Sequence, residues 1–312
     1  MEKIQTDVLI IGSGPAGITA GIYTVRGGLK TTILTGMTAG GQLTTTTDVE
    51  NYPGFEKPIS GFELMDKMLK QATNLGIEID YTSATNIDFK NNPFVCETDN
   101  GKVYESKFVI IATGADARYL GLESETKFKG FGVSGCATCD GNFYKNQDVL
   151  VVGGGDTAGT EAIHMSHLAK KVYLSHRRDQ FRMEKILEDK IKNTPNIEIL
   201  YSTELEEVLG QNMPKMVTGV RLKNKKTNEI KQIDLQGVFI AIGRSPASDF
   251  LKDSGLEISE QGYIDTKPDS AETNIKGVFA VGDITKKPHK QAIVAAGYGC
   301  IAALEIEKLL NN

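Results

Sequence analysis

One strand-and-turn pattern occurs twice in the chain, 141 residues apart, and it constrains the fold more than any other feature. Residues 7–11 are mostly apolar and lead directly into GSGPAG at Gly12–Gly17, and residues 148–152 lead in the same way into GGGDTA at Gly153–Ala158. A buried strand, a glycine-rich turn and a helix open a βαβ unit in which the turn admits a pyrophosphate and the helix N-terminus stabilises its charge. The repeat therefore predicts an α/β protein with two Rossmann-like dinucleotide-binding folds.

The first copy has the complete glycine fingerprint. Gly12 permits a tight turn, Gly14 lets phosphates approach the backbone, and Gly17 lets helix and strand pack closely. The usual acidic residue for a ribose hydroxyl is missing, because the next strand is followed by Thr35 and Gly36. A glycine turn that binds nothing is the alternative, but the position between a strand and a helical stretch favours dinucleotide binding.

The second copy carries basic residues at the ribose position. His176, Arg177, Arg178 and Arg182 follow its second strand. Guanidinium groups bind phosphate oxygens through paired hydrogen bonds, so these arginines favour a 2′-phosphate and therefore NADP(H) over NAD(H). A solvated basic patch before a helix at residues 183–192 is the alternative.

Two cysteines stand close together in the sequence CATCDG. Cys136 and Cys139 have the spacing of a redox dithiol, in which the neighbouring sulfur and local dipoles make a thiolate available for exchange. A zinc half-site is the main alternative, but zinc needs about four ligands and the histidines follow no ligand pattern with the cysteines. Chance spacing without chemistry also remains open. Cys96 and Cys300 are each expected to be a buried packing thiol.

Apolar strands near residues 108–112 and 237–242 end in glycine turns, where the chain can cross between domains. We therefore expect the second fold to be inserted into the first. The predicted domains are residues 1–117 and 246–312 for the first fold, and residues 118–245 for the insertion.

Two more segments complete the expected architecture. Residues 196–231 are expected to form polar, hairpin-like strands, including residues 197–201 and 217–222. A strand ending at Gly282 and Asp283, followed by a helix over residues 291–310, is expected to finish the first fold. An aspartate after a strand lies where open α/β sheets bind ligands, although a helix-capping role is the simpler alternative.

Composition narrows the function classes. The 312 residues carry a net charge of −5, and an acidic protein has no general attraction for nucleic acid or anionic lipid. The first apolar run is too short for a membrane span or a signal peptide, so we expect a soluble, cytoplasmic protein with no nucleic-acid or membrane partner. In a reducing cytosol a disulfide is more often catalytic than structural, which favours the redox interpretation of the cysteine pair.

Several motifs together resemble those of the low-molecular-weight, bacterial-type thioredoxin reductases, flavin-dependent members of the pyridine nucleotide-disulfide oxidoreductases. The resemblance covers essentially the whole chain and rests on these motifs: GSGPAG at Gly12–Gly17, GGQLTTTT at Gly40–Thr47, CATCDG at Cys136–Gly141, GGGDTA at Gly153–Ala158, HRRDQFR at His176–Arg182 and FAVGD at Phe279–Asp283. It implies FAD in the first fold, NADPH in the second, a homodimer, and thioredoxin as the disulfide substrate, with a role in cell redox homeostasis.

The resemblance also implies which residues contact each cofactor. For FAD these are Gly12, Ser13, Gly14, Pro15, Ala16, Thr35, Gly36, Gly40, Gly41, Gln42, Asn51, Thr113, Gly282, Asp283, Lys290, Gln291 and Ala292. For NADPH they are Gly153, Gly155, Asp156, Thr157, His176, Arg177, Arg178, Arg182, Ile242 and Gly243. Two positions depart from the family pattern, since Lys290 replaces a common arginine and Asp156 replaces a frequent asparagine.

The implied reaction carries electrons from NADPH through FAD and the Cys136–Cys139 disulfide to thioredoxin. In the family the second cysteine faces the flavin, so Cys139 is expected there and Cys136 is expected to attack the substrate disulfide. Asp140 is the candidate acid for the leaving thiolate, and a turn residue is the alternative. Because the dithiol and the NADPH fold belong to one insertion, we expect that insertion to rotate between half-reactions.

Other functions share parts of this pattern. A flavin-dependent reductase of another protein disulfide, or of a peroxiredoxin, would use the same motifs, although the peroxiredoxin-linked enzymes usually carry an additional N-terminal redox domain. A nucleotide-binding redox sensor without turnover, or a zinc-binding module, is the alternative from a different class.

Overall fold

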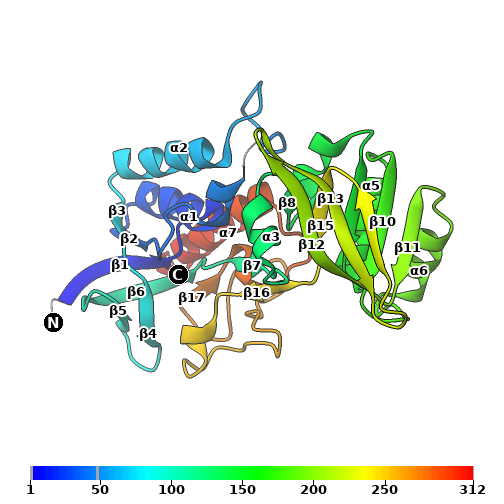
Figure 1. The fold of residues 1–312 in the computed structure, drawn as a ribbon. Helices are drawn as coiled ribbons and strands as arrows, with labels where there is room; N and C mark the ends of the chain where they lie inside the picture. The colour runs from blue at the N-terminus through cyan, green and yellow to red at the C-terminus, as the bar shows by residue number, and fades with distance from the viewer. Residues whose placement is uncertain (1–2, 47–48, 312) are drawn as a thin grey trace. The chain divides into compact units, whose positions relative to one another are not determined.

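The computed structural model describes residues 3–46 and 49–311, so Thr47 of the GGQLTTTT motif lies outside the described residues (Figure 1). The chain divides into two compact units. The outer unit comprises residues 1–116 and 245–312, and the inserted unit comprises residues 117–244. These crossings lie one residue before each boundary that the sequence predicts.

The outer unit is built on a mixed sheet. Its strands follow the order β3 (Glu78–Asp80), β2 (Thr31–Leu34), β1 (Lys3–Ile11), β6 (Val103–Ile111), β5 (Phe94–Thr98) and β4 (Ala84–Asp88), with β17 (Val278–Ala280) also paired to β6. From β3 to β6, and between β6 and β17, neighbouring strands are parallel. The pairs β5–β6 and β4–β5 are antiparallel.

The central strands are apolar along their length because both faces of this sheet are covered. Val8 and Ile10 of β1 pack with the helices, whereas Leu9 and Ile11 pack on the opposite face with residues such as Leu251, which ends the short 3-10 helix Asp249–Leu251. Side chains alternate between the faces of a strand, so burial on both sides requires an uninterrupted apolar run. This is the pattern that the sequence shows before each glycine turn.

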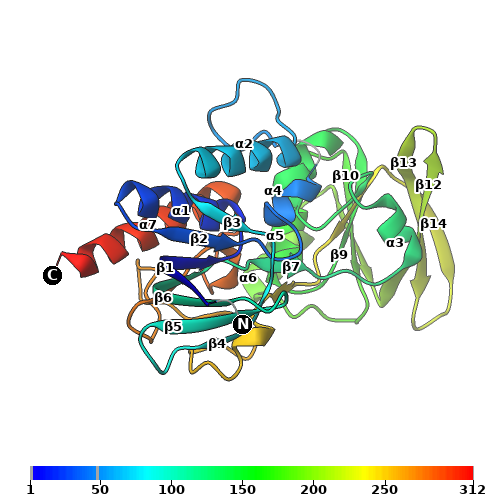
Figure 2. The same cartoon turned by 90° about the vertical axis from the view of Figure 1, so that its left-hand side faces the viewer.

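The helices of the outer unit are α1 (Pro15–Arg26), α2 (Gly61–Asn74) and α7 (Ala292–Leu310). Figures 1 and 2 show α7, from the end of the chain, beside α1, from its beginning. The two helices pack closely, since a Cβ atom on Gly299 would lie 2.2 Å from the carbonyl oxygen of Ala16. The last helix therefore completes a fold that the first residues begin.

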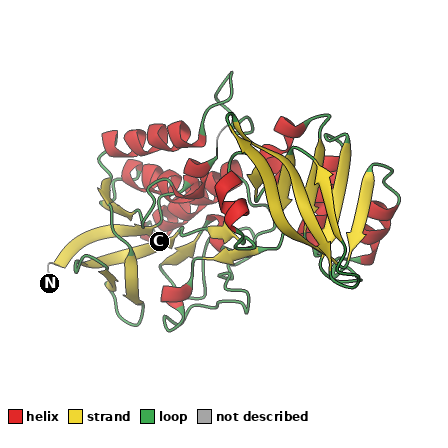
Figure 3. Ribbon diagram, in the orientation of Figure 1, coloured by secondary structure: helices red, strands yellow, loops and turns green. Residues whose placement is uncertain are grey.

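The inserted unit contains a parallel sheet with the order β11 (Ile197–Tyr201), β10 (Lys171–His176), β9 (Asp148–Val152), β15 (Gly237–Ile240) and β8 (Val133–Ser134). Its helices are α3 (Glu123–Phe128), α4 (Ala137–Asp140), α5 (Asp156–Ser166) and α6 (Lys185–Lys192). A separate antiparallel sheet consists of β12 (Thr203–Asn212), β13 (Lys215–Asn224) and β14 (Ile230–Asp234). Figure 3 shows these strands in yellow and the helices in red.

The hairpin prediction for residues 197–201 is wrong. This strand, β11, pairs in parallel with β10 and extends the parallel sheet of the inserted unit. The hairpin is formed instead by β12 and β13, which includes the predicted strand at residues 217–222. A short strand with mixed side chains does not show which partner it will choose, because pairing depends on residues distant in sequence.

The two crossings between the units pair with each other. Strands β7 (Ala115–Ala117) and β16 (Arg244–Pro246) form a two-stranded sheet. Within the outer unit Ala247 donates its N–H to the carbonyl of Gly114 at 3.1 Å, and within the inserted unit Arg118 donates to Gly243 at 3.0 Å. The glycines predicted as crossing points thus anchor both connections.

The two isolated cysteines differ. Cys96 on β5 is 1% exposed, as predicted, and burial raises the pKa of its thiol to about 12. The prediction of a buried thiol is wrong for Cys300, which is half-buried and makes a hydrogen bond with the hydroxyl of Tyr23. Within residues 3–46 and 49–311, no helix has the length and apolar character needed to span a membrane.

Candidate active site

The carboxyl ends of the outer strands lie at one level. Ile11 at the end of β1 is opposite both Leu34 of β2 and Ile111 of β6, and Ala280 of β17 is also opposite Ile111. The loops after these strands carry most of the residues predicted to bind FAD, including Gly12, Thr35, Thr113 and Gly282. Ligands of open α/β sheets bind at this edge.

The glycine loop is closed against the protein at two positions and open at a third. A Cβ atom on Gly12 would lie 2.3 Å from the carbonyl oxygen of Ala112, and one on Gly17 would lie 1.9 Å from the carbonyl oxygen of Gly12. At Gly14 no described atom lies within 4 Å of such a Cβ. Gly14 is therefore the position where a pyrophosphate can approach, as the fingerprint predicts.

A buried hydroxyl group marks the same edge. Thr113, which directly follows β6 and Ala112, has an Oγ1 atom that is buried and has no hydrogen-bond partner within the described residues. Buried polar atoms are rarely left unsatisfied, so this hydroxyl fits a ligand atom. Together with the open position at Gly14, it shows that the residues present fit a bound dinucleotide.

Ser13 joins three segments of this edge. Its Oγ accepts a hydrogen bond from the N–H of Gly40 at 2.9 Å and donates to the carbonyl of Thr35 at 3.3 Å. The neighbouring Gln42 donates to the carbonyl of Ala115. The predicted residues from the first loop, the end of β2 and the Gly40 turn are thus connected directly.

The C-terminal residues of the predicted FAD set also gather in the outer unit. Asn51 donates to the side chain of Gln291 at 3.3 Å, although 240 residues separate them in sequence. The ammonium group of Lys290 donates to the carbonyls of Asp283 at 3.2 Å and Thr285 at 2.5 Å, and it lies 4.8 Å from the ring centre of Tyr263. The lysine that replaces the family arginine therefore holds the turn after β17.

The inserted sheet repeats the first arrangement. Val152 at the end of β9 lies opposite Ser175 of β10 and Ile240 of β15. A Cβ atom on Gly153 would lie 2.3 Å from the carbonyl oxygen of Ala241, whereas Gly155 has no described atom within 4 Å of its Cβ position. Gly153 and Gly155 thus correspond to Gly12 and Gly14 of the outer loop, and the predicted Ile242 and Gly243 follow β15 at the same edge.

His176 lies under this second loop. The imidazole is 5% exposed and packs so closely that a Cβ atom on Gly154 would lie 2.2 Å from its Cε1. Its Nε2 lies 3.0 Å from the carbonyl oxygen of Gln180, and the ring stacks on Phe181 with centres 5.4 Å apart. The buried ring therefore supports the backbone of the Gly153 loop.

The predicted arginines cluster around His176. Burial lowers the pKa of His176, and the positive charges of Arg182, Arg178 and Arg177 lower it further. Each of the three arginines is exposed, and none forms an ion pair within the part of the chain that the structure describes. The neighbouring acid, Asp179, is paired with Lys226 at 2.9 Å. This arrangement leaves positive charge available for a phosphate.

Asp156, one of the two departures from the family pattern, has a structural role. It is the first residue of α5, and its Oδ1 accepts a hydrogen bond from the N–H of Glu184 at 2.8 Å. Glu184 is the N-cap residue of α6. The carboxylate therefore connects the starts of two helices, and the neighbouring Thr157 is exposed beside it.

Cys136 and Cys139 form a disulfide with Cα atoms 5.3 Å apart. They follow β8, whose residues Val133 and Ser134 pair in parallel with β15. The disulfide therefore lies at the same carboxyl edge of the inserted sheet as the Gly153 loop. The N–H of Cys136 donates to the hydroxyl of Ser134 at 3.1 Å, which fixes the start of this redox loop, defined as residues 136–140.

Asp140 ends α4 and is half-buried. Its backbone N–H donates to the carbonyl of Cys136 at 3.1 Å. Burial, together with the charge of Asp140, raises the pKa of Tyr144 to about 12. The carboxyl group of Asp140, itself part of the disulfide loop, is thus close enough to the half-buried phenol of Tyr144 to act on it electrostatically.

Sequence reasoning missed Glu161. This residue of α5 is 9% exposed and accepts a hydrogen bond from the backbone N–H of Ala137, which lies between the two cysteines. Burial raises the pKa of its carboxyl group to about 7. The available signal was its spacing, because Glu161 shares a helix face with the buried Ala158 and Met165.

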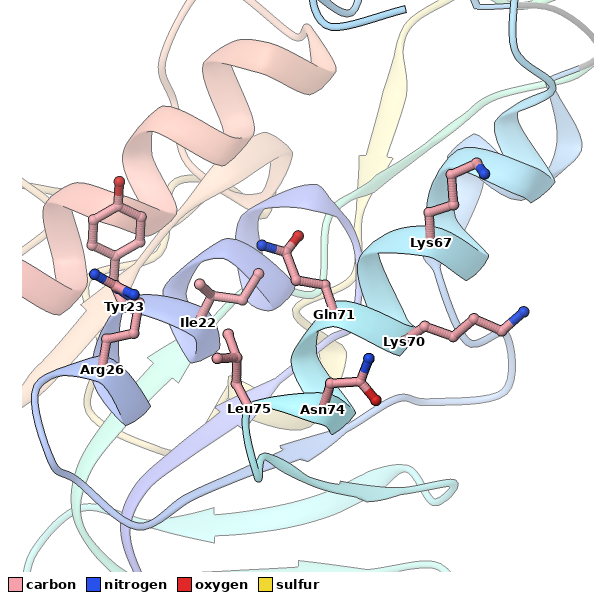
Figure 4. Close-up of a pocket in the computed structure, with 8 residues that line it drawn as sticks. All are labelled: Ile22, Tyr23, Arg26, Lys67, Lys70, Gln71, Asn74 and Leu75. Atoms are coloured by element: carbon pink, nitrogen blue, oxygen red, sulfur yellow. The ribbon is translucent and has the colours of Figure 1, made fainter.

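A separate groove of the outer unit lies between α1 and α2 (Figure 4). Its lining residues are Ile22, Tyr23, Arg26, Lys67, Lys70, Gln71, Asn74 and Leu75. They come from the C-terminal part of α1, from α2 and from Leu75 directly after it, whereas the Gly12 loop precedes α1. All of them fall outside the predicted site residues.

Comparisons with known proteins agree with this geometry. The family model described as pyridine nucleotide-disulphide oxidoreductase matches residues 6–299. A thioredoxin reductase of Rickettsia typhi is 50% identical, with 99% of this chain and 100% of the relative covered. The chain belongs to the pyridine nucleotide-disulphide oxidoreductase family and, within it, to the group of bacterial-type thioredoxin reductases. The family resemblance and the fold class that the sequence predicts are confirmed.

Two solved structures extend the comparison. The thioredoxin reductase from Giardia duodenalis is 39% identical with a TM-score of 0.94, and 99% of each chain is covered. The thioredoxin reductase from Lactococcus lactis in the FR conformation is also 39% identical, covering 98% of this chain and 99% of its own, with a TM-score of 0.66. At equal identity, the overall match differs widely between the two.

Proposed function

We propose that this protein is an NADPH-dependent thioredoxin-disulfide reductase. It would carry electrons from NADPH through FAD and the Cys136–Cys139 disulfide to the disulfide of thioredoxin. The observation that carries the proposal is the position of this disulfide at the carboxyl edge of the sheet that also bears the Gly153 loop. The full-length thioredoxin reductase relatives support the same activity.

The proposal assigns one cofactor to each unit. FAD would bind in the outer unit, at the open position beside Gly14 and the unsatisfied hydroxyl of Thr113. NADPH would bind in the inserted unit, with its pyrophosphate at Gly155 and its 2′-phosphate at the exposed arginines around His176. The remaining residues predicted for each cofactor belong to the same unit.

When bound, the flavin would supply the two-electron carrier between nicotinamide and disulfide. In the protein itself, the Cys136–Cys139 disulfide would take up two electrons and two protons and become two thiols. Cys136 would attack the thioredoxin disulfide, forming a mixed disulfide and releasing one substrate thiol. Cys139 would then displace the second substrate thiol and restore the internal disulfide.

Asp140 would supply the proton that the leaving thiolate takes up. Its adjacency to Cys139 and its half-buried position support this role. An Asp140→Asn variant should reoxidise its reduced dithiol with thioredoxin more slowly, by about 10²-fold, because general acid catalysis contributes 10²–10⁴-fold. An unchanged rate in stopped-flow measurements would assign Asp140 to the turn alone.

Both NADPH and the disulfide must reach the flavin, so the proposed function requires one unit to move. The disulfide and the NADPH residues belong to the inserted unit, and the FAD residues belong to the outer unit. We therefore propose that the inserted unit rotates about β7 and β16, so that each group reaches the flavin in turn. The different overall matches of two equally identical relatives support such a motion. A cross-link that locks the units should stop multiple turnover, and full activity of the locked enzyme would refute rotation.

Thioredoxin would be the macromolecular substrate, the enzyme would act as a homodimer, and it would work in the cytoplasm, where a reducible disulfide can cycle. Light scattering of the purified protein tests the oligomeric state.

One experiment tests the function directly. NADPH oxidation should depend on a cognate thioredoxin, and Cys136→Ser should abolish that dependence while NADPH still bleaches the flavin spectrum. The matched control is Cys96→Ser, a buried thiol outside the site, which should keep the activity. Activity with a different protein disulfide only would favour a related reductase. A colourless protein with bound zinc, or a nucleotide-binding protein without turnover, would overturn the proposal.

A further inference from the structure

Glu161 is a buried acid that the proposed electron transfer does not use. It lies on α5, and its Oε2 atom is buried without a hydrogen-bond partner among the described residues. Burying a carboxyl group is unfavourable unless the group is hydrogen-bonded or neutral. A charged residue on the buried face of a helix therefore needs an explanation.

The partner of Glu161 lies inside the redox loop. Its carboxyl group accepts a hydrogen bond from the N–H of Ala137, a residue that is completely buried between Cys136 and Cys139. Helix α4, which Ala137 begins, packs against α5. The contact therefore joins an ionisable group directly to the backbone that holds the disulfide.

The surroundings of Glu161 determine when it is charged. Its main influence is burial, which disfavours the carboxylate, while the Ala137 N–H and the positive charge of Arg244 favour it. His164, on the same helix, has a pKa lowered by burial and by the positive charge of His167, so its own charged form is disfavoured. The elements packed against α5 carry these further ionisable groups: Asp140 on α4, Asp148 on β9, Lys171, Tyr173 and His176 on β10, and Lys185, Glu188, Asp189, Lys190 and Lys192 on α6.

Several of these further groups form ion pairs, and Asp140 lies in the redox loop itself. Lys171 pairs with Glu198 at 2.6 Å, and Glu188 pairs with Lys192 at 2.5 Å. Lys185 pairs with Asp189 at 3.1 Å. Burial has the largest effect on the pKa of the Glu161 carboxyl group. Arg244 is the charged group that lowers this pKa.

We propose that Glu161 is a positioning residue for the Cys136–Cys139 couple, holding the Ala137 amide in place and opposing, through its negative charge, the thiolate of the reduced loop. This role rests on the proposed function only in requiring a redox-active disulfide. It is a contact within the inserted unit and needs neither cofactor for its existence.

The charge of Glu161 gives the couple a specific pH dependence. Reduction of the disulfide takes up two electrons and two protons, and the reduced loop can then release one proton to give a thiolate. Above pH 7 the ionised Glu161 disfavours that thiolate by like-charge repulsion, and below pH 7 the neutral carboxyl does not. Glu161 therefore favours the disulfide more strongly at pH 8 than at pH 6.

The test is an equilibrium with dithiothreitol, which supplies both electrons and both protons as it closes to its cyclic disulfide. The purified flavoprotein is equilibrated at defined ratios of reduced to oxidised dithiothreitol at pH 6 and pH 8, quenched with acid, and scored for free thiols by alkylation and mass spectrometry. Glu161→Gln keeps an oxygen acceptor for the Ala137 amide but removes the charge. It should raise the equilibrium constant for reduction about tenfold at pH 8, equivalent to about 30 mV, and leave it nearly unchanged at pH 6.

The matched control is Glu125→Gln. Glu125 is 1% exposed in the same unit, but its carboxylate accepts hydrogen bonds from Leu120 and Gly121, both at 2.9 Å, instead of from the redox loop. This variant should match the wild type at both pH values. Glu161→Ala, which removes the charge together with the acceptor, should show the same rise at pH 8.

Two results would overturn the proposal. In the first, the equilibrium constant for reduction of Glu161→Gln equals that of the wild type at pH 6 and at pH 8. In the second, the variant changes this constant by the same factor at both pH values. The proposed function fails separately, because thioredoxin and NADPH do not enter this equilibrium. A wild-type protein that equilibrates with dithiothreitol but does not reduce thioredoxin would refute the proposed thioredoxin reductase activity and leave this inference intact.

Discussion

The two glycine loops, at Gly12 and at Gly153, use the same backbone solution and differ in the side chains that surround it. In both, the first glycine has its Cβ position blocked by a carbonyl oxygen 2.3 Å away, and the third residue of the loop is open. The outer loop is linked to its neighbours by the small Ser13, whereas the inserted loop rests on the ring of His176. Under the proposed function, the turn would provide a place for a pyrophosphate, and the residues after the second strand would decide which nucleotide fits.

The largest expected effect tests the shared backbone. Gly12→Ala and Gly153→Ala should each lower the free energy of unfolding by about 3 kcal/mol or more, because the new methyl group has no space. Gly14→Ala and Gly155→Ala are the controls and should cost less than about 1 kcal/mol. Urea unfolding followed by circular dichroism measures both pairs. Equal losses at the blocked and the open glycines would show that the space at Cβ does not set the cost, and unequal losses at Gly12 and Gly153 would show that the two loops are not built alike.

The next prediction concerns the difference between the loops. Arg177→Ala combined with Arg178→Ala should raise KM for NADPH by about 10–100-fold and leave KM for NADH and kcat nearly unchanged, because charge-assisted hydrogen bonds to the 2′-phosphate contribute about 1.5–3 kcal/mol. Steady-state kinetics with both nucleotides measures the effect.

The control for the arginine pair is Arg221→Ala. Arg221 is on β13 and is held by Glu206 and Glu207, so its loss should leave both KM values unchanged. If the double variant weakens NADH and NADPH equally, the arginines support the loop instead of selecting the phosphate.

A smaller effect tests the connection of the inserted loop to α6. Asp156→Ala removes the acceptor for the Glu184 N–H and should lower the free energy of unfolding by about 1 kcal/mol. Asp156→Asn keeps an oxygen acceptor and should cost only a few tenths of that. Thermal unfolding of both variants provides the measurement, and identical melting temperatures would remove this role from Asp156.

The smallest expected effect comes from His176. Because its pKa is lowered, the folded protein binds fewer protons than the unfolded chain, so its contribution to stability is complete above about pH 6.5 and is lost as the pH falls further. Glu161 acts in the opposite direction, since its raised pKa adds stability as the pH falls. The pH dependence of wild-type stability therefore combines the opposing contributions of His176 and Glu161.

A variant separates them. The melting temperature of the wild type should fall by about 1–2 °C more than that of His176→Gln between pH 7 and pH 5.5. His289→Gln, at an exposed position, should follow the wild type. A His176→Gln curve parallel to that of the wild type would mean that the buried imidazole titrates normally.

Much of the site could be read from short segments. GSGPAG and GGGDTA each determine a local turn whose conformation depends on adjacent residues, and both occur where expected at the ends of β1 and β9. Contacts between distant segments could not be read in this way. The hydrogen bond between Asn51 and Gln291 and the pairing of β11 with β10 depend on how the chain folds back on itself.

By itself the sequence determined the doubled α/β fold, the dithiol and the basic residues after β10, because each depends on side chains within a few positions of one another. Only the tertiary structure decided what faces these groups. Lys290 holds the carbonyls of Asp283 and Thr285, and Glu161 reaches the amide between the cysteines from a helix that begins 17 residues after Cys139. A buried acid is identified by what covers it, and burial depends on packing between elements that no local pattern records.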